Sequence, residues 1–159
     1  MELYHGSNVE VRNPKLLKSD RRLDFGAGFY LTSSYDQAAR WAVLTAKRRG
    51  KGIPTVSSFE FDESRLPELS VLRFEDATVD WLKFVGDNRF GRIKSDNWDI
   101  AIGPVANDAT MPVLSLFFAE VYTEEETIRR LLPQNLKDQY AFKTQRAIDL
   151  LRFREVVRA

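Results

Sequence analysis

Apolar positions recur with two different periods along the chain, and the period predicts the type of each element. From residue 34 to 47, apolar side chains recur at helical spacing after Ser33 or Ser34, either of which can cap a helix. The alanine-rich face of this helix is expected to pack on a sheet. Short apolar runs bounded by turn residues predict strands. The predicted strands are 2–5, 29–32, 55–61, 98–102, 139–142 and 153–157.

Further helices are predicted at 75–84, at 111–122, from Thr123 to Leu132 and from Thr144 to Leu151, and 111–122 also fits a strand. Strands and helices mix without a regular βαβ repeat, which favours an α+β fold over a doubly wound α/β sheet. No Gly-x-Gly-x-x-Gly follows a strand, and no Gly-Lys-Thr phosphate loop is present. The length of 159 residues fits one domain.

Charge and composition narrow the function classes. Lys plus Arg number 24 and Asp plus Glu 23, so the net charge of +1 gives no bulk attraction to nucleic acid or anionic lipid. The chain has no cysteine, and His5 is its single histidine. Thiolate chemistry and a histidine-rich metal site are therefore excluded, and no metal is expected. No signal peptide and no apolar run of about 20 residues is visible, so we expect a cytoplasmic protein without a membrane segment.

Three stretches combine chemistry-bearing residues with turn residues. They are Leu-Tyr-His-Gly-Ser at 3–7, Asp-Phe-Gly-Ala-Gly-Phe-Tyr-Leu-Thr at 24–32 and Asp-Gln-Tyr-Ala-Phe at 138–142. In this order they resemble the three motifs of the ADP-ribosyltransferase superfamily, in the His-Tyr-Glu branch of diphtheria toxin and the poly(ADP-ribose) polymerases. With 37–42 and 102–108 added, nearly the whole chain resembles an uncharacterised bacterial family of small, stand-alone ADP-ribosyltransferase-like proteins.

The resemblance implies one domain over residues 1–159 with an α+β fold. Two small antiparallel sheets would form a split β-sandwich with flanking helices. NAD⁺ would lie between the sheets and be consumed as a substrate, with no metal.

The resemblance also assigns roles to residues of the first two motifs. The backbone N–H and C=O of Gly6 would hold the nicotinamide carboxamide, since glycine has no side chain to block close approach. His5 would bind the adenosine ribose, with the Ser7 hydroxyl nearby. Tyr30, in a Gly-x-Tyr that begins at Gly28, would stack on nicotinamide.

Phe29 and Tyr30 cannot both face the site, because neighbouring strand residues point to opposite faces. We expect Tyr30 in the site and Phe29 in the core. Gln139 stands where most active enzymes of the branch have Glu, and it offers the sugar cation only a dipole. A lost charge of this kind costs about 2–4 kcal/mol in a dry site. Asp138 is expected to point to the opposite face.

Basic residues between the first two motifs are candidate partners of the NAD⁺ pyrophosphate. We select Arg21 or Arg22, next to Asp24. Asn107-Asp108 is expected to order a loop or to contact the acceptor, because this stretch recurs in the resembling family.

The resemblance therefore implies a mono-ADP-ribosyltransferase acting on a protein or nucleic-acid acceptor of unknown type, with His5, Tyr30 and Gln139 as its catalytic residues. Members are often encoded beside a small helical protein, which suggests the toxin of a toxin–antitoxin or defence pair and a small helical antitoxin as partner. Two alternatives stay open: an inactive module that binds NAD⁺ or ADP-ribose, and an NAD⁺ glycohydrolase that uses water as its acceptor.

Overall fold

The computed structural model describes residues 1–17, 23–93, 96–106 and 110–159 and has an α+β fold built on two small sheets. The first sheet has the strand order β1-β3-β7, and the second has the order β2-β6-β5-β4. The first sheet consists of β1 (Glu2–Ser7), β3 (Thr55–Glu60) and β7 (Arg152–Arg158). The second consists of β2 (Phe29–Leu31), β6 (Asp138–Phe142), β5 (Ile100–Pro104) and β4 (Val71–Arg73).

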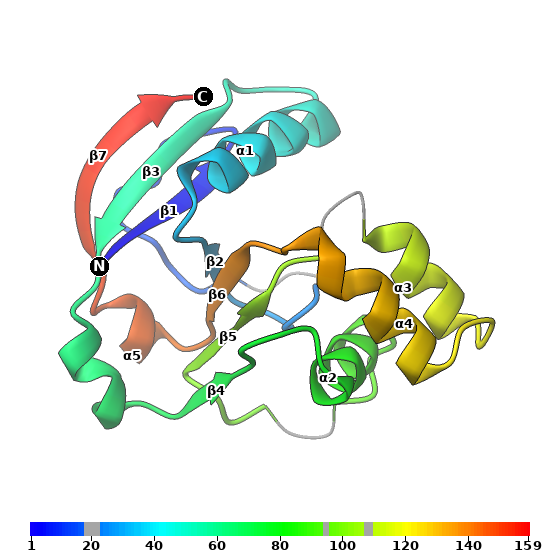
Figure 1. The fold of residues 1–159 in the computed structure, drawn as a ribbon. Helices are drawn as coiled ribbons and strands as arrows, with labels where there is room; N and C mark the ends of the chain where they lie inside the picture. The colour runs from blue at the N-terminus through cyan, green and yellow to red at the C-terminus, as the bar shows by residue number, and fades with distance from the viewer. Residues whose placement is uncertain (18–22, 94–95, 107–109) are drawn as a thin grey trace.

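Helices flank both sheets (Figure 1). The long helix α1 (Tyr35–Arg49) lies along β1 and β3, while α2 (Val79–Arg89), α3 (Met111–Phe118) and α4 (Glu124–Leu131) gather beside the second sheet. The shorter elements are α5 (Gln145–Ile148) and the 3₁₀ turns at Glu63–Glu68 and Leu132–Gln134. In the described part of the chain, no helix is both long and apolar enough to cross a membrane.

Side-chain caps set where the helices begin. Ser34, Thr123 and Thr144 each accept a hydrogen bond from the amide three residues later, so these helix starts follow the predicted capping residues. The prediction for α2 began too early. Thr78 accepts from the amide of Trp81, and the helix begins at Val79 instead of residue 75. The described part of 111–122 is helical over Met111–Phe118, as the favoured prediction had it.

The prediction that both sheets are wholly antiparallel was wrong for one strand pair. The sequence analysis missed β4, which pairs in parallel with β5 through Val71↔Ile100 and Arg73↔Ile102. The other ladders between named strands are antiparallel. A three-residue strand has too few positions to show a period, and α2 supplies the crossover that a parallel pair requires.

The strand predicted at 98–102 begins at Ile100 and continues through Gly103 and Pro104, which lie inside β5. The ladder with β4 stops at Ile102, and the amide of Phe74 donates to the Ile102 carbonyl. Pro104 comes after that point, where the ladder no longer needs the N–H that proline lacks. Its carbonyl is free to accept hydrogen bonds from side chains.

Two apolar clusters hold the layers together. One lies between the sheets and contains Leu3, Phe29, Phe59, Tyr140 and Phe142. The other lies between the second sheet and the helices.

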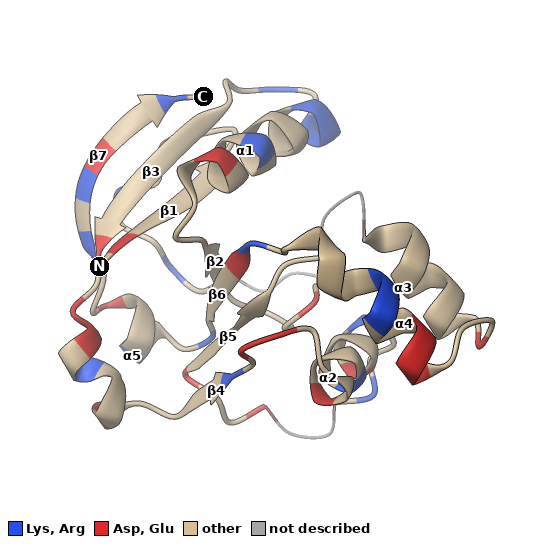
Figure 2. Cartoon of the chain, viewed as in Figure 1, with Lys and Arg blue, Asp and Glu red and all other residues tan. Residues whose placement is uncertain are grey.

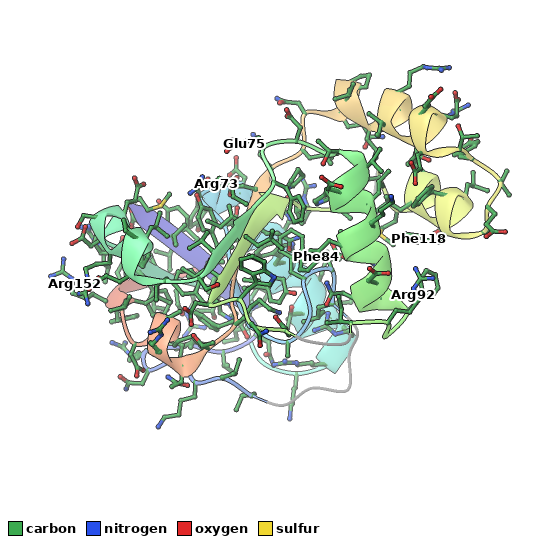
Figure 3. The ribbon with its side chains drawn as sticks, turned by 90° about the horizontal axis from the view of Figure 1, so that it is seen from below. Arg73, Glu75, Phe84, Arg92, Phe118 and Arg152 are labelled. Carbon is green, nitrogen blue, oxygen red and sulfur yellow. The ribbon has the colours of Figure 1, made fainter. Side chains whose placement is uncertain are left out.

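The second cluster centres on Trp81, which is fully buried, with Phe25 and Leu114. Figure 3 shows Phe84 on the side of α2 that faces the strands, and its ring centroid lies 5.6 Å from that of Phe25. Trp41 and Trp98 are only partly buried.

Candidate active site

Among the described residues, one backbone bridge joins the two sheets, between Tyr4 in β1 and Thr32 just after β2. The Tyr4 amide donates to the Thr32 carbonyl at 2.8 Å, and the Thr32 amide donates back to the Tyr4 carbonyl at 2.9 Å. In this antiparallel register, Gly6 comes opposite Tyr30. No bridge joins Gly6 to Tyr30 among the described residues, so the strands part at this point.

The backbone of Gly6 faces this open edge. Alternate residues of a strand direct their N–H and C=O to the same side, so the groups of Gly6 point the same way as those of Tyr4. Strand β3 lies on the opposite side of β1. Within the described part of the chain, the Gly6 N–H and C=O therefore lack a main-chain partner. We call this donor and acceptor pair, together with the backbone of Tyr30 opposite, the β1 edge.

Gly6 also lies against the backbone of α1. A Cβ atom built on Gly6 would come within 1.9 Å of the Ala38 carbonyl oxygen and 2.8 Å of the Ala42 nitrogen. The sequence analysis explained this glycine by the approach of a ligand. The structure adds a packing reason on the other face of the strand, because only glycine lets α1 lie this close to β1.

His5 points to the face of β1 that lies between the sheets. Its ring stacks on Phe29, with centroids 4.2 Å apart and planes at 29°. Its Nδ1 lies 2.7 Å from the Tyr30 carbonyl oxygen. Because a carbonyl can only accept, Nδ1 carries the proton, and the Nε2 of the neutral ring is an acceptor. If the ladder continued past Tyr4 and Thr32, the Tyr30 carbonyl would accept a hydrogen bond from the Gly6 amide. It accepts one from the His5 side chain instead.

Burial keeps this histidine neutral. It lowers the pKa of His5 to about 4, and the positive charge of Arg49 acts in the same direction. The hydrogen bond to the Tyr30 carbonyl acts the other way but does not compensate. At neutral pH the group next to the β1 edge is therefore an uncharged hydrogen-bond acceptor.

Tyr30 is fixed by the loop that precedes it. Its hydroxyl accepts from the Phe25 amide at 3.0 Å and donates to the Gly26 carbonyl at 2.6 Å. Burial raises the pKa of Tyr30, so the phenol stays protonated. Phe29 lies in the core, as expected. Tyr30 lies on the opposite face of β2, where its partly buried ring contacts the cluster around Trp81.

Two cations that the sequence analysis did not select hold the same loop. Lys143 is almost fully buried; its ammonium donates to the carbonyls of Phe25 and Ala27 and pairs with Asp96 at 2.8 Å. Arg89 of α2 pairs with Asp24 at 2.5 Å. Neither residue lies in a motif, and their contacts form only when β6 and α2 come together in the fold.

Gln139 is buried at the start of β6 and lies opposite Gly103 of β5. Its Nε2 donates to the Pro104 carbonyl at 3.3 Å, and the indole nitrogen of Trp81 donates to the same oxygen at 3.0 Å. The side-chain amide of Gln139 therefore lies at the third motif position and is also held by a hydrogen bond inside the protein.

Asp138, the residue before Gln139, carries a partly exposed carboxylate. Its Oδ1 accepts from the Thr32 hydroxyl at 3.2 Å and from the Ser33 amide at 2.9 Å, and its Oδ2 accepts from the Ser33 hydroxyl at 2.6 Å. These bonds tie the start of β6 to the junction between β2 and α1. They place a negative charge beside Thr32, which is the residue that joins the sheets.

The remaining predicted site residues take different positions. Ser7 is buried, with its hydroxyl 3.4 Å from the Asn8 side chain. Gly28 lies close to β6, since a Cβ there would approach the Phe142 carbonyl to 3.1 Å. Arg21 and Arg22 lie outside the described residues.

Asn107-Asp108 also falls outside the part of the chain that the structure describes. The described cations near the end of β1 include those of the last turn of α1, which is basic (Figure 2). There the Arg49 guanidinium donates to the Asn8 side chain at 2.8 Å.

Described residues form two hollows, and neither is lined by His5, Gly6 or Tyr30. One, of about 290 Å³, opens at the end of the first sheet between Asn8, Ile53 and Arg158. The other, of about 100 Å³, lies between Ala77, Pro104 and Leu136. Pro104 lines the second hollow and is the acceptor of Gln139, but Gln139 itself is not part of the lining.

The fold and this edge define the chain as an α+β protein whose two sheets separate beside a polar strand edge. Residues 1–153 match the model of a family described as a protein of unknown function (DUF3990), and the chain belongs to that family. No curated protein and no solved structure matches the chain.

Proposed function

We propose that the protein is a cytoplasmic, NAD⁺-dependent mono-ADP-ribosyltransferase. The observation that carries the proposal is the N–H and C=O of Gly6 at the β1 edge, which have no main-chain partner among the described residues and lie beside a fixed tyrosine and a neutral histidine. A primary carboxamide has one donor end and one acceptor end, so it matches the two groups of Gly6. Nicotinamide carries such a carboxamide on a flat cationic ring.

The neighbouring side chains suit the rest of NAD⁺. The Nε2 of His5 can accept a hydrogen bond from a ribose hydroxyl, because Nδ1 is occupied by the Tyr30 carbonyl. The Tyr30 ring can stack on nicotinamide while its hydroxyl remains bonded to the loop. Fixed partners of this kind orient a substrate at little entropic cost during the reaction.

The reaction breaks the bond between C1′ of the ribose and the nicotinamide nitrogen. The bonding electron pair goes to that nitrogen, so neutral nicotinamide leaves and positive charge develops on the sugar. A nucleophilic O–H or N–H group of the acceptor then forms a bond to C1′ and releases its proton. As in glycoside hydrolysis, negative charge near the sugar stabilises the transition state.

An inactive module that binds NAD⁺ or ADP-ribose is the second candidate. The buried neutral amide of Gln139 favours it, because Gln139 gives the sugar a dipole where a carboxylate would give a charge. Chain elongation is less suited to this site than a single transfer for the same reason.

Labelled NAD⁺ distinguishes these candidates. The protein is incubated with a cell lysate and NAD⁺ labelled on its ADP-ribose half, and the label is sorted into protein, nucleic acid and free ADP-ribose. Tyr30→Ala removes the proposed stacking ring, and Tyr122→Ala is the matched control, since Tyr122 lies by Arg130 of α4. A transferase labels a macromolecule with wild type and Tyr122→Ala and loses the label with Tyr30→Ala.

The other outcomes contradict the transferase proposal in different ways. Label found only in free ADP-ribose indicates water as the acceptor and a glycohydrolase. NAD⁺ binding by calorimetry without nicotinamide release supports the inactive module. Absence of both binding and release contradicts every NAD⁺-based function.

A further inference from the structure

We propose that Asp138, and not Gln139, supplies the negative charge that stabilises the sugar cation. This inference rests on the proposed function. It starts from the difference between the two neighbouring side chains at the start of β6, of which one is charged and partly exposed while the other is neutral and buried.

Gln139 is poorly suited to this task in the fold as well as in its chemistry. It is 3% exposed, and its amide nitrogen is directed to the Pro104 carbonyl, which also holds the indole of Trp81. Its amide oxygen can accept a hydrogen bond while the nitrogen stays bonded to Pro104, but the amide is neutral. Gln139 therefore offers the sugar a dipole and not the charge that stabilises a cation.

Asp138 has both the charge and a free acceptor position. A carboxylate has about four lone-pair positions, and Asp138 uses three of them for Thr32 and Ser33. Its Oδ2 accepts one described hydrogen bond, from the Ser33 hydroxyl, and so can accept a second one. The bonds from Ser33 fix the direction of the carboxylate in advance of substrate binding.

The register places Asp138 at a suitable separation from the β1 edge. Gly6 comes opposite Tyr30, Tyr30 pairs with Ala141, and Asp138 lies three residues along β6 from Ala141. The three residues along β6 span roughly 10 Å, at about 3.3 Å per residue, and the step from β1 across β2 to β6 adds two strand spacings of about 4.8 Å each, so Gly6 and Asp138 are roughly 14 Å apart. The nicotinamide ring, its bond to the ribose and an aspartate side chain together can fill such a span.

In the reaction, Asp138 accepts a hydrogen bond from the 2′-hydroxyl of the nicotinamide ribose. The C1′–nitrogen bond breaks, its electron pair leaves with nicotinamide, and the positive charge on the sugar forms beside the carboxylate. The acceptor's nucleophilic O–H or N–H group then bonds to C1′ and its proton passes to solvent. Asp138 gains and loses no proton in this sequence.

The test compares Asp138→Asn with Ser33→Ala. The first variant removes the charge and keeps the size of the side chain, while the second removes one hydrogen bond to the same carboxylate and keeps the charge. Nicotinamide release, NAD⁺ affinity by calorimetry and thermal stability are measured for each. We expect Asp138→Asn to lower kcat about 100-fold or more with NAD⁺ affinity within about 3-fold. Ser33→Ala keeps the charge and the bond from the Ser33 amide and removes only the hydroxyl bond, so we expect it to lower kcat by less than about 10-fold.

Two results would overturn the inference while leaving the transferase intact. One is a wild-type enzyme whose turnover Asp138→Asn leaves within about 2-fold. The other is equal losses of kcat and stability in Asp138→Asn and Ser33→Ala, which indicates a purely structural carboxylate. A wild-type chain that releases no nicotinamide at all overturns the proposed function, and the inference with it.

Discussion

The imidazole of His5 donates a hydrogen bond to the main-chain carbonyl of Tyr30 across 2.7 Å, at the point where β1 and β2 separate. The His5 side chain of β1 thus takes the hydrogen bond of the Tyr30 carbonyl of β2. Among the described residues, the N–H and C=O of Gly6 are left without a main-chain partner. Histidine and tyrosine are 25 residues apart in sequence, and their link is through the tyrosine backbone and not through its ring. The contact places the ring proton of His5 on Nδ1.

The first prediction concerns the titration of His5. We expect its NMR resonances to give a pKa near 4, because burial opposes the charged ring. Since the unfolded chain binds the proton near pH 6.5, stability is highest above that pH and falls as pH drops from 6.5 to 4. The loss of unfolding free energy over this range is at most about 3 kcal/mol, because the His5 ring is partly exposed and water reduces the effect of burial.

The chain has one histidine, so a single pair of ring signals reports this titration. A His5→Gln variant is the control for the stability profile, and its loss between about pH 6.5 and pH 4 should be smaller than that of wild type. A histidine that titrates near pH 6.5 in the folded protein contradicts the buried Nδ1 contact.

The second prediction concerns the contact between Gly6 and α1. We expect Gly6→Ala to lower the free energy of unfolding by about 3 kcal/mol or more, because the added methyl group meets backbone atoms that cannot rotate away. Gly50→Ala is the matched control. Gly50 has a φ of 64°, and no atom lies within 4 Å of the position that an added methyl group would take, so only backbone strain of about 1 kcal/mol is expected. Urea denaturation measures both, and equal losses would falsify the close contact.

The third prediction concerns Lys143. Its ammonium donates hydrogen bonds to two loop carbonyls and pairs with Asp96. The Lys143→Met variant leaves these three groups without that partner. A loss of about 2–3 kcal/mol follows from the unsatisfied carbonyls alone. Lys83→Met on the exposed side of α2 should change stability by less than about 0.5 kcal/mol. Faster hydrogen exchange at Phe25 and Gly26 in the Lys143 variant would locate the effect in the loop.

The fourth prediction concerns Asp99, which lies just before β5. The Arg146 guanidinium at 2.5 Å, with bonds from the Thr144 hydroxyl and the Ser70 amide, lowers the pKa of Asp99 to about 2. Because this folded pKa is below the unfolded value of 3.8, the stabilisation is present above about pH 4 and is lost as pH falls towards 2. Asp99→Asn should therefore cost roughly 2 kcal/mol at about pH 7 and much less at about pH 2.

Two further variants separate the parts of this cluster. Arg146→Ala should cost less than Asp99→Asn, because the Arg146 side chain is 66% exposed and water screens its charge. Asp149→Asn, in an exposed position on the same segment, is the control and should show no loss beyond a surface hydrogen bond. A larger effect from Arg146 than from Asp99 would show that the guanidinium, and not the buried carboxylate, is the centre of the cluster.

The fifth prediction concerns Gln139→Glu. A glutamate there would face the Pro104 carbonyl without the N–H that Gln139 provides, in a position that is 3% exposed. Burial raises the pKa of such a carboxyl, so we expect the variant to lose about 1–3 kcal/mol at about pH 8 and to recover part of this below about pH 6. Thermal denaturation of the variant and of wild type at the two pH values measures the difference.

The sequence was sufficient to predict the α+β class, the helix caps at Thr123 and Thr144, and the opposite faces of Phe29 and Tyr30. These features depend on local periods and on a side chain reaching an amide three residues away, which the order of residues records directly. It was not sufficient for β4, whose three residues have no visible period, nor for the parallel pairing that follows from it.

At the candidate site, the sequence indicated His5, Gly6 and Tyr30 through their motifs, but not the supports around them. Lys143 and Arg89 contact the loop only after distant strands and helices assemble. A lysine after a strand is normally solvated, and no pattern marks this one as buried. Contacts of this type have to be read from the fold.

The fit between Gly6 and α1 has a mechanical consequence. At Gly6 the backbone of α1 packs directly on the backbone of β1, with no side chain between them, so the helix and the strand are held as one rigid unit. The helix also begins directly after β2, on the other side of the junction. The spacing between Gly6 and Tyr30 therefore depends on how closely α1 is seated against β1.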